Sequence, residues 1–581
     1  MRADNSIKRY FPILKWGSRY RKDKFLDDSI AAMVVAIMLI PQSLALAILA
    51  GLPAEMGLYA SIFGLLLYSI FGTSSSLSVG PVAVVSLMTA AALSKLGLGS
   101  SAEYIAAALT LTFLCGGILL LLGLLRLGFM ANFLSHPVIS AFITASGILI
   151  GVSQLQHLLG ISTSGYNLIE LGLSLSDSIT EINLITLSIG VFSIVFILWC
   201  RIGLRALLRK WGCGERTAAV FSRAGPIFTV ATTSLLVFAY NLSERGVQTL
   251  GEIPGGLPGM TIPDFSFTLV NSLLGSAMLI SIIGFVESVS VGQTLAVRKR
   301  ERIDLDQELV GLGAANIASS LAGGFPVTGG FSRSVVNYDA GASTPAAGLI
   351  TSILIALVAI FFTPVLFWLP KACLAAIIIV AVSSLIDFSV LRKSWNYSRA
   401  DFTAVSLTLI LTLLVGVEIG IAAGVLASIV VHLYKTSKPH VAVVGKVPGT
   451  EHYRNVERHD VQTHENILSV RIDESLYFAN TRYLEKILFG LVAEKPKLEH
   501  VILMCTAINK IDLSALEALE KADKGLAEIH IKLHLSEVKG PIMDKLSDTD
   551  FFLNLSGNNY MSHDQAVEDL KGKEDKPSND L

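Results

Sequence analysis

The residues best suited to chemistry lie in the short stretch Gly324–Pro345 (GFPVTGGFSRSVVNYDAGASTP), which carries Arg333 and Asp339 between long apolar segments. A charge in such surroundings is costly unless a cavity, a partner or a ligand receives it. The Gly-Gly pair before Phe331 predicts a helix that begins inside the membrane, with its first N–H groups open to a cavity. Because a helix start favours negative charge, the stretch predicts a binding site for a small anion.

Arg333 follows Ser332 at the predicted start of this half-helix. Its guanidinium can complement a tetrahedral or planar oxyanion, helped by the helix N–H groups. Ser332 and Ser334 offer hydroxyls, and Ser332 is the better candidate. The alternative is a structural arginine that pairs with Asp339 or Glu287.

Glu287 lies in the middle of another apolar segment. Burial favours its protonated form, whereas a nearby Arg333 favours the ionised form, so the carboxyl could exchange protons near neutrality. Proton coupling needs such a group, because a loaded proton offsets part of the charge of a divalent anion as it crosses. The alternative is a permanent Glu287–Arg333 salt bridge.

Two further segments supply hydrogen-bond donors. Gln42 follows a helix-kinking proline, and its amide can donate to an oxyanion; the alternative is a hydrogen bond between helices. Segment 80–97 opens on Gly-Pro, and Pro81 suits the first turn of a helix. We expect Val82 and Ala83 to present backbone N–H groups there.

Composition places these residues in a membrane protein. Of 581 residues, 52% are hydrophobic and 16% charged, and the mean hydropathy is +0.62; a soluble protein of this size is less apolar. The net charge of −1 gives no reason to expect nucleic-acid binding. We expect no metal site, no cofactor and no enzymatic reaction, because neither the histidines nor the cysteines show ligand spacing and no catalytic triad stands out. The cysteines are Cys115, Cys200, Cys213, Cys373 and Cys505.

Hydrophobic segments fill most of the first 435 residues and predict a polytopic α-helical protein. A crossing helix needs roughly 20 residues, so the short third and tenth segments are candidate half-helices. We predict fourteen spans, at 27–50, 56–72, 80–97, 103–125, 132–151, 182–200, 225–241, 270–295, 306–323, 331–343, 345–367, 371–387, 401–416 and 418–435.

The distribution of Lys and Arg sets the orientation. Eight of them precede Phe25, so we expect the N-terminal segment 1–26 to be cytoplasmic. Clusters such as Arg201–Lys210 follow even-numbered spans, whereas the expected outer loop 152–181 has no positive charge and 242–269 only one. This pattern predicts a multi-pass protein of the cell membrane with both termini cytoplasmic.

The two halves of the transmembrane domain (27–436), at about 27–241 and 270–436, look related. Gln42 and Glu287 occupy the middle of the first span of each half, and each half has a Gly-rich opening before its third span. Seven spans per half would invert the second half relative to the first. Inverted repeats with broken helices near the midplane are typical of secondary transporters.

After residue 436 the chain becomes polar. We predict a linker over 437–464, a domain over 465–570 and a disordered tail over 571–581. Alternating strands and helices predict a small α/β domain on a mainly parallel sheet. The expected strands are 466–472, 476–479, 500–504 and 530–535, and the expected helices are 481–492, 513–525 and 541–546.

Four ordered motifs, with the soluble domain behind them, resemble the SulP / solute carrier family 26 anion transporters, and the soluble part resembles their STAS domain. The likeness covers about 25–570. It implies a core-and-gate fold of fourteen spans, elevator-like alternating access, a homodimer, and a substrate such as sulfate, bicarbonate or a dicarboxylate. The motifs are PQSLALAILAGLP (41–53), SLSVGPVAVVSLM (76–88), GFVESVSVGQTLA (284–296) and GGFSRSVVN (329–337).

The resemblance also assigns roles. Gln42 matches a binding glutamine of the family, and Ser332–Arg333 matches a serine-arginine pair beside the anion. A glutamate at the position of Glu287 goes with proton-driven members, and an aspartate with sodium-driven ones. Leu46 matches a position of the pocket wall that is often aromatic, a departure that bears on substrate size.

In the STAS domain, Ser514 follows Asp512 at a strand-to-helix junction. Related anti-sigma-factor antagonists carry a phosphorylatable serine in this loop, so Ser514 is a candidate regulatory site. The alternative is plain helix capping.

We therefore predict a secondary active transporter, with proton-coupled sulfate symport as the first hypothesis. Sodium-coupled or exchange transport of bicarbonate or a dicarboxylate is the alternative within transport. A passive anion channel or a STAS-linked sensor is the alternative of another class, and a channel has no need of Glu287. The expected partners are the anion, protons, the lipid bilayer, a second copy of the chain and a cytoplasmic protein that binds the STAS domain.

Overall fold

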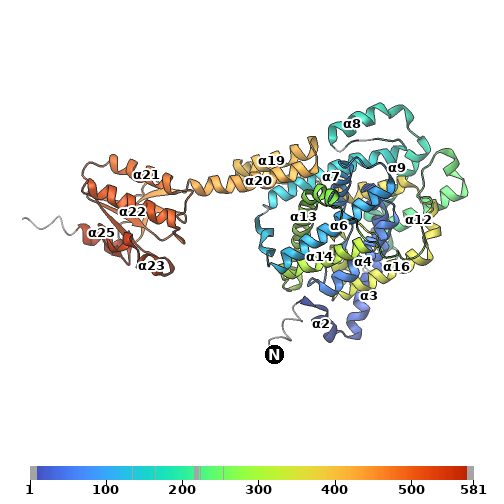
Figure 1. Cartoon of the computed structure of the whole chain (residues 1–581), viewed down its shortest axis with the longest axis horizontal. Helices are drawn as coiled ribbons and strands as arrows, with labels where there is room; N and C mark the ends of the chain where they lie inside the picture. Colours follow the sequence, from blue (N-terminus) through green and yellow to red (C-terminus); the bar gives the residue numbers. More distant parts are fainter. Residues whose placement is uncertain are drawn as a thin grey trace, which may run out of the picture. The chain divides into compact units, whose positions relative to one another are not determined.

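The computed structural model describes residues 10–133, 135–163, 165, 167–212, 214, 221–222, 224–252 and 254–571. Residues 1–9, Cys213 and the expected tail from 572 lie outside the described residues. The chain forms two compact units, Met1–Ser428 and Ile429–Leu581. The first is a bundle of helices, and the second carries a β-sheet with helices against it (Figure 1).

Each of the fourteen predicted hydrophobic segments contains a helix in the described part of the chain. They are α3 (Lys22–Leu49), α4 (Glu55–Phe71), α5 (Ala83–Ser94), α6 (Ser101–Leu124), α7 (His136–Leu159), α9 (Leu184–Trp199), α12 (Gly225–Ala239), α13 (Phe267–Lys299), α14 (Leu305–Leu321), α15 (Phe331–Asp339), α16 (Ala346–Phe361), α17 (Lys371–Ser383), α19 (Arg399–Leu414) and α20 (Val417–Ser437).

Shorter helices connect them. α9 continues through a π-helix, η4 (Cys200–Leu204), into α10 (Arg205–Lys210). The remaining α-helices are α2 (Ile13–Trp16), α8 (Leu168–Asp177) and α18 (Ser389–Tyr397), and the 3-10 turns are η1 (Gly17–Arg19), η2 (Gly128–Phe133), η3 (Ile179–Glu181), η5 (Leu242–Arg245) and η6 (Thr363–Trp368).

Six helices in the described part of the chain are long and apolar enough to cross a membrane, and five more apolar helices are shorter. The helical membrane fold is thereby confirmed, while the count of fourteen spans stays a prediction. The six long helices are Lys22–Leu49, Ser101–Leu124, His136–Leu159, Leu184–Lys210, Phe267–Lys299 and Val417–Ser437.

The helices of the first unit pack as two groups. In the first group, α14 packs against α6 and α4, α13 against α6, and α16 against α4 and α3. Gly116 and Gly313 let α6 and α14 approach closely, because a Cβ on Gly313 would lie 2.7 Å from the backbone nitrogen of Leu120. In the second group, α17 packs against α7 and α9, α19 against α7, and α12 against α9. We call these the first and second helix groups; α5 and α15 belong to the first and α20 to the second.

The two predicted half-helices begin side by side. The two-residue strands β1 (Val79–Gly80) and β2 (Thr328–Gly329) pair antiparallel. α5 starts directly after β1 and has 12 residues; α15 starts directly after β2 and has 9. Neither is long enough to cross a membrane alone. Two helix N-termini therefore meet inside the first helix group.

The second unit carries a six-stranded sheet in the order β4-β3-β5-β6-β7-β8. β5 to β8 are parallel, so the predicted mainly parallel α/β domain is confirmed. The strands are β3 (Val441–Lys446), β4 (Tyr453–Asn455), β5 (Ile467–Ile472), β6 (His500–Met504), β7 (Lys532–Ser536) and β8 (Asn559–Tyr560); the helices are α21 (Thr481–Ala493), α22 (Leu513–Glu528), α23 (Gly540–Leu546), α24 (Asp550–Leu553) and α25 (His563–Lys571).

Two local expectations for this unit were wrong. The segment 437–464, expected as a linker, supplies β3 and β4, which pair antiparallel at one edge of the sheet. The expected strand 476–479 makes only an isolated bridge, Leu476 with Ile511. In β3 a short apolar run stands alone among polar residues, and it becomes a strand because β5 offers it a free edge.

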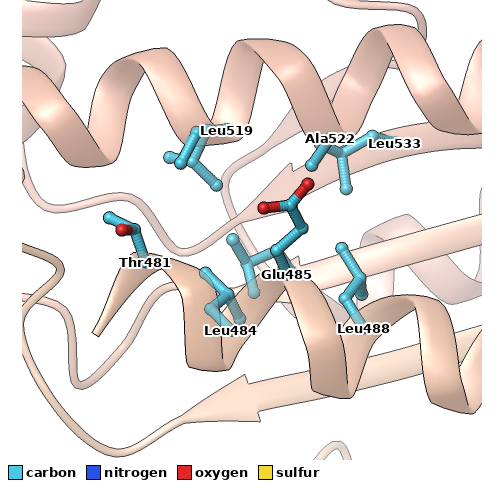
Figure 2. A pocket seen from close by; sticks show the side chains of 9 residues that line it. Thr481, Leu484, Glu485, Leu488, Leu519, Ala522 and Leu533 are labelled. Carbon is cyan, nitrogen blue, oxygen red and sulfur yellow. The ribbon is translucent and has the colours of Figure 1, made fainter. Parts of the chain in front are cut away.

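Alternate residues of the strands bury on opposite faces of the sheet. Leu468 and Val470 of β5 pack under α21 and α22, whereas Ile467 packs on the face of α25. A void of about 10 Å³, no larger than one water, lies between α21 and α22. Figure 2 shows side chains that line it. Glu485 reaches across it toward α22, where its carboxylate pairs with Lys521 at 3.1 Å. The void is part of the apolar core and not a ligand site.

His563 makes the stability of this unit depend on pH. Its side chain is 1% exposed, its Nδ1 lies 2.8 Å from the Ser536 hydroxyl, and its ring packs edge-on against Tyr453. Burial lowers the pKa of His563 to about 4, against about 6.5 in an unfolded chain. Its contribution to stability is therefore complete above about pH 6.5. As the pH falls from about 6.5 to about 4, His563 is protonated in the unfolded state before it is protonated in the folded state. The free energy of unfolding therefore falls by up to about 3 kcal/mol.

We expect His563→Asn to remove most of this acid sensitivity, because an amide keeps a hydrogen bond to Ser536 and does not titrate in this range. The measurement is hydrogen–deuterium exchange of β7 and α25 in the full-length protein between pH 7 and pH 4.5. His530→Asn, at an exposed position, serves as the matched control. Equal acid sensitivity in wild type and His563→Asn would contradict the expectation.

Candidate anion-binding site

A cavity of about 470 Å³ lies between the two helix groups. α3 and α15 of the first group line it on one side, and α9 with η4, α12 and α17 of the second group on the other. Its polar lining residues are Gln42, Ser332, Ser222, Ser384 and Arg201. This volume suits a small ligand.

Two of the sequence-predicted residues meet in this cavity. Gln42 of α3 and Ser332 in the first turn of α15 both line it. The Gln42 amide donates no hydrogen bond to any residue that the structure describes, so the alternative role in holding two helices together finds no partner. Both groups are free to bind a ligand.

Arg333 lies behind the cavity wall and joins the two half-helices. Its side chain is 2% exposed, and its Nη1 donates to the carbonyl oxygen of Pro81 at 2.5 Å. Nε and Nη2 are buried and have no hydrogen-bond partner among the described residues. A buried charged group left unpaired is costly, so these two N–H groups are available donors for an anion.

Glycines make room for this guanidinium. A Cβ on Gly330 would lie 2.8 Å from the Arg333 Nη2, and one on Gly80 would lie 3.4 Å from the same atom. Both glycines stand directly before a half-helix or its preceding proline. The Gly-rich openings therefore serve to pack backbone against the arginine as well as to break the helices.

Glu287 of α13 is largely buried and interacts electrostatically with Arg333. It lines a void of about 10 Å³ whose other walls are apolar, including Val84 and Phe142. No ion pair within 4 Å joins Glu287 to another described residue. The permanent Glu287–Arg333 salt bridge, considered as an alternative, is absent from this conformation.

The other predicted site residues lie elsewhere. The Ser334 hydroxyl donates to the Gly330 carbonyl at 2.7 Å and accepts from the Ser78 N–H at 2.9 Å, so it ties the half-helix starts together. Leu46 is 1% exposed inside the apolar core and does not line the cavity. Val82 is the N-terminal cap of α5 and Ala83 its first residue, a position where backbone N–H groups lack partners within the helix.

Asn316 of α14 hydrogen-bonds to the extended segment that leads into β2. Its Nδ2 donates to the Val327 carbonyl and its Oδ1 accepts from the Val327 N–H, both at 2.9 Å. Ser288 of α13, which the sequence did not point to, hydrogen-bonds to Thr328 at 2.6 Å and accepts from the Gly329 N–H at 2.8 Å. These contacts fix β2 between two long helices.

Two buried carboxylates that sequence reasoning missed hold the loops around the half-helices. Glu308 accepts from the Tyr68 hydroxyl at 2.7 Å, from the Thr73 N–H at 2.8 Å and hydroxyl at 2.5 Å, and from the Ser74 N–H at 3.2 Å. Asp28 accepts from the N–H and hydroxyl of Thr344 at 3.0 and 2.6 Å. The first fixes the approach to β1, and the second fixes the exit from α15.

A second cavity, of about 770 Å³, is apolar. It is lined by α3, α12, α16 and η6, and none of its described lining residues is charged. Such a surface does not suit an anion.

Ser514 lies exposed in the first turn of α22. Asp512 caps the helix, because its Oδ1 accepts from the Ala515 N–H at 2.8 Å. The other oxygen of Asp512 accepts from the Phe478 N–H at 2.9 Å. Capping therefore falls to Asp512, and no described residue hydrogen-bonds to the Ser514 hydroxyl.

Comparison with known proteins identifies the family. The model of the sulfate permease family matches residues 25–408, and the STAS domain model matches residues 458–566. The chain belongs to the sulfate permease family. This is a family of transporters and not of enzymes. The chain is 35% identical to the chloroplastic sulfate transporter 4.1 of Arabidopsis thaliana, covering 92% of this chain and 78% of that one. It is 33% identical to the high affinity sulfate transporter 1 of Stylosanthes hamata, covering 93% and 82%.

Solved structures share the fold. Murine solute carrier 26 family member A9, an anion transporter in the inward-facing state, superposes with a TM-score of 0.89 at 22% identity, covering 98% of this chain and 95% of that one. The transmembrane domain of the cyanobacterial bicarbonate transporter BicA superposes with a TM-score of 0.59 at 21% identity, covering 70% and 98%. At this identity the likeness concerns the fold alone.

Proposed function

We propose that the chain is a proton-coupled sulfate symporter of the cell membrane. The observation that carries the proposal is Arg333, a buried guanidinium with two unpaired nitrogens where two half-helices begin. The relatives described as sulfate transporters, which match almost the whole chain, favour sulfate as the anion. Sulfate has four oxygens, and a guanidinium can bind two of them at once.

In the proposed site, Arg333 and the helix starts at Val82, Ala83 and Ser332 surround the anion, and Gln42 donates from α3. Transport then needs the site to face each side of the membrane in turn. We infer an elevator-like movement of the first helix group against the second, because the cavity lies between the groups while the half-helices belong to one of them.

Proton coupling is assigned to Glu287. A protonated Glu287 adds one positive charge to the loaded site relative to the ionised form, which reduces the net charge that crosses with a divalent anion. The electrostatic interaction with Arg333 links proton binding to anion binding. When Glu287 is protonated, Arg333 no longer interacts with a carboxylate and can interact fully with the anion. The anion and the proton therefore favour each other's binding.

The remaining assignments follow the charge pattern and the fold. We propose that both termini are cytoplasmic, that the chain works as a homodimer, and that a cytoplasmic protein binds the STAS domain. Ser514 is the proposed regulatory position, because its exposed hydroxyl at a helix start would tolerate a phosphate.

Uptake of radiolabelled sulfate into proteoliposomes tests the function. When the two gradients are imposed separately, we expect an inward proton gradient to raise the rate of sulfate uptake and a sodium gradient to leave it unchanged. Unlabelled bicarbonate, oxalate and fumarate serve as competitors. Uptake driven by sodium, or competition by bicarbonate at equal concentration, would replace this proposal by the alternatives named above.

Gly330→Ala should weaken sulfate binding about tenfold or more without unfolding the chain. The new Cβ would lie 2.8 Å from the Arg333 Nη2 and displace the guanidinium, while the φ of −87° at Gly330 suits alanine. Gly275→Ala in α13 is the matched control, because nothing lies within 4 Å of its Cβ. The measurement is the KM for sulfate uptake, and an unchanged KM in Gly330→Ala would contradict the placement of Arg333 beside the anion.

A further inference from the structure

Arg201 is a charged residue of the cavity that the proposed site does not use. It follows α9 on the π-helix η4, and it is the one charged side chain among the described lining residues of the 470 Å³ cavity. No acidic side chain pairs with it in the part of the chain that the structure describes. Its guanidinium is exposed, so it keeps its charge in the mouth of the cavity.

The backbone around Arg201 is held in place. A π-helix widens the helical turn and often marks a functional position. The Ser222 hydroxyl, which also faces the cavity, donates to the Cys200 carbonyl at 2.7 Å. It also lies 3.3 Å from the Arg201 carbonyl. The side chain of Arg201 is thus presented from a fixed backbone, and no partner for it lies among the residues that the structure describes.

Arg201 and the proposed site lie on different helix groups. Gln42 and Ser332 line the cavity from the first group, whereas Arg201 lines it from α9 and η4 of the second. If the groups move past each other, an anion held by Arg201 must leave it before it crosses. Arg201 is therefore placed to act on capture and not on translocation.

We propose that Arg201 forms a capture subsite for the transported oxyanion at the mouth of the cavity. The proposal rests on the proposed function. A lone positive charge in a cavity whose other lining residues are uncharged raises the local concentration of anions and the rate at which they arrive. The anion passes from Arg201 to Ser332 and Gln42 in the same cavity, and then to Arg333 behind them.

Because the charge pattern predicts Arg201 on the cytoplasmic side, the test compares Arg201→Gln and Arg201→Lys with Arg298→Gln in proteoliposomes that receive sulfate at the cytoplasmic face of the protein. Arg298 is an exposed arginine at the end of α13 that does not line the cavity, so its variant removes the same charge elsewhere. We expect Arg201→Gln to raise the KM for sulfate supplied at the cytoplasmic face about 5- to 10-fold with kcat within about twofold, and Arg201→Lys to restore part of the affinity. High salt should shrink the difference, because it screens an exposed charge. Arg298→Gln should behave as wild type.

A KM in Arg201→Gln equal to that of Arg298→Gln would overturn the capture subsite, as would a fall in kcat at unchanged KM. Sulfate, bicarbonate and oxalate are each tested as substrate, which separates the two proposals. If wild type transports bicarbonate or oxalate but not sulfate, the sulfate proposal fails, and the effect of Arg201→Gln is measured on the KM for the transported anion. If wild type carries sulfate and Arg201→Gln is normal, transport stands and the subsite fails. If wild type carries none of the three, both are overturned.

Discussion

Arg333→Gln should abolish sulfate binding and uptake while leaving the chain as stable as wild type or more stable. Glutamine can still donate to the Pro81 carbonyl, which Arg333 Nη1 contacts at 2.5 Å. It lacks the charge and cannot reproduce the two buried nitrogens that have no partner. Hydrogen bonds to charged groups are worth about 1.5–3 kcal/mol each, so losing two lowers the affinity by about 100-fold or more.

The stability of this variant distinguishes the two interpretations of Arg333. A structural arginine that holds the half-helices together would cost stability when removed, by about 3–5 kcal/mol for a buried pair. An arginine that waits for an anion is an unpaired buried charge in the empty protein, and its removal should raise the melting temperature. The measurements are thermal unfolding without sulfate and radiolabelled sulfate binding, with Arg298→Gln as the control. A destabilised variant that still binds sulfate would contradict the assignment.

The sequence predicted this site because its charges stand out against apolar surroundings. Arg333 and Glu287 are visible as single ionisable residues in long hydrophobic segments, and the Gly-rich openings mark both half-helices. Glu308 and Asp28 are buried as deeply as Arg333, but each stands near the end of a hydrophobic segment, where a charge usually faces the membrane surface. Their hydrogen bonds come from loops distant in the sequence, which no local pattern reveals.

Helical periodicity explains why Leu46 was expected in the pocket wall although it does not line the cavity. Met38 and Leu46 are each four residues from Gln42, so both belong to its face of the helix. The cavity extends from Gln42 toward Met38, whereas Leu46 packs in the core on the other side of Gln42. Which way the cavity runs depends on the helices of the second group, and periodicity within α3 does not contain that information. The sequence did not predict Arg201 as a cavity residue for the same reason, since it does not show which helices line the cavity. In the sequence Arg201 is one of many positive charges that set the orientation.

Glu287→Gln should separate binding from coupling. The amide resembles the protonated carboxyl in size and charge, so the variant is fixed in the form that favours the anion. We expect it to bind sulfate at least as tightly as wild type, since Arg333 no longer faces an ionised carboxylate. Exchange of internal for external sulfate should persist. Net uptake should no longer respond to an inward proton gradient, because no proton is taken up or released in the cycle.

The measurement is the ratio of initial uptake rates with and without an inward proton gradient, alongside sulfate exchange at equal pH. Glu252→Gln, at an exposed position between α12 and α13, removes a carboxylate that should not matter. A variant whose uptake keeps the gradient dependence of wild type would rule out Glu287 as the coupling group. The two variants thus fail differently: Arg333→Gln loses exchange and net uptake together, and Glu287→Gln loses only the response to protons. If one residue served both anion binding and proton coupling, or if the two formed a permanent ion pair, both variants would lose the same activities.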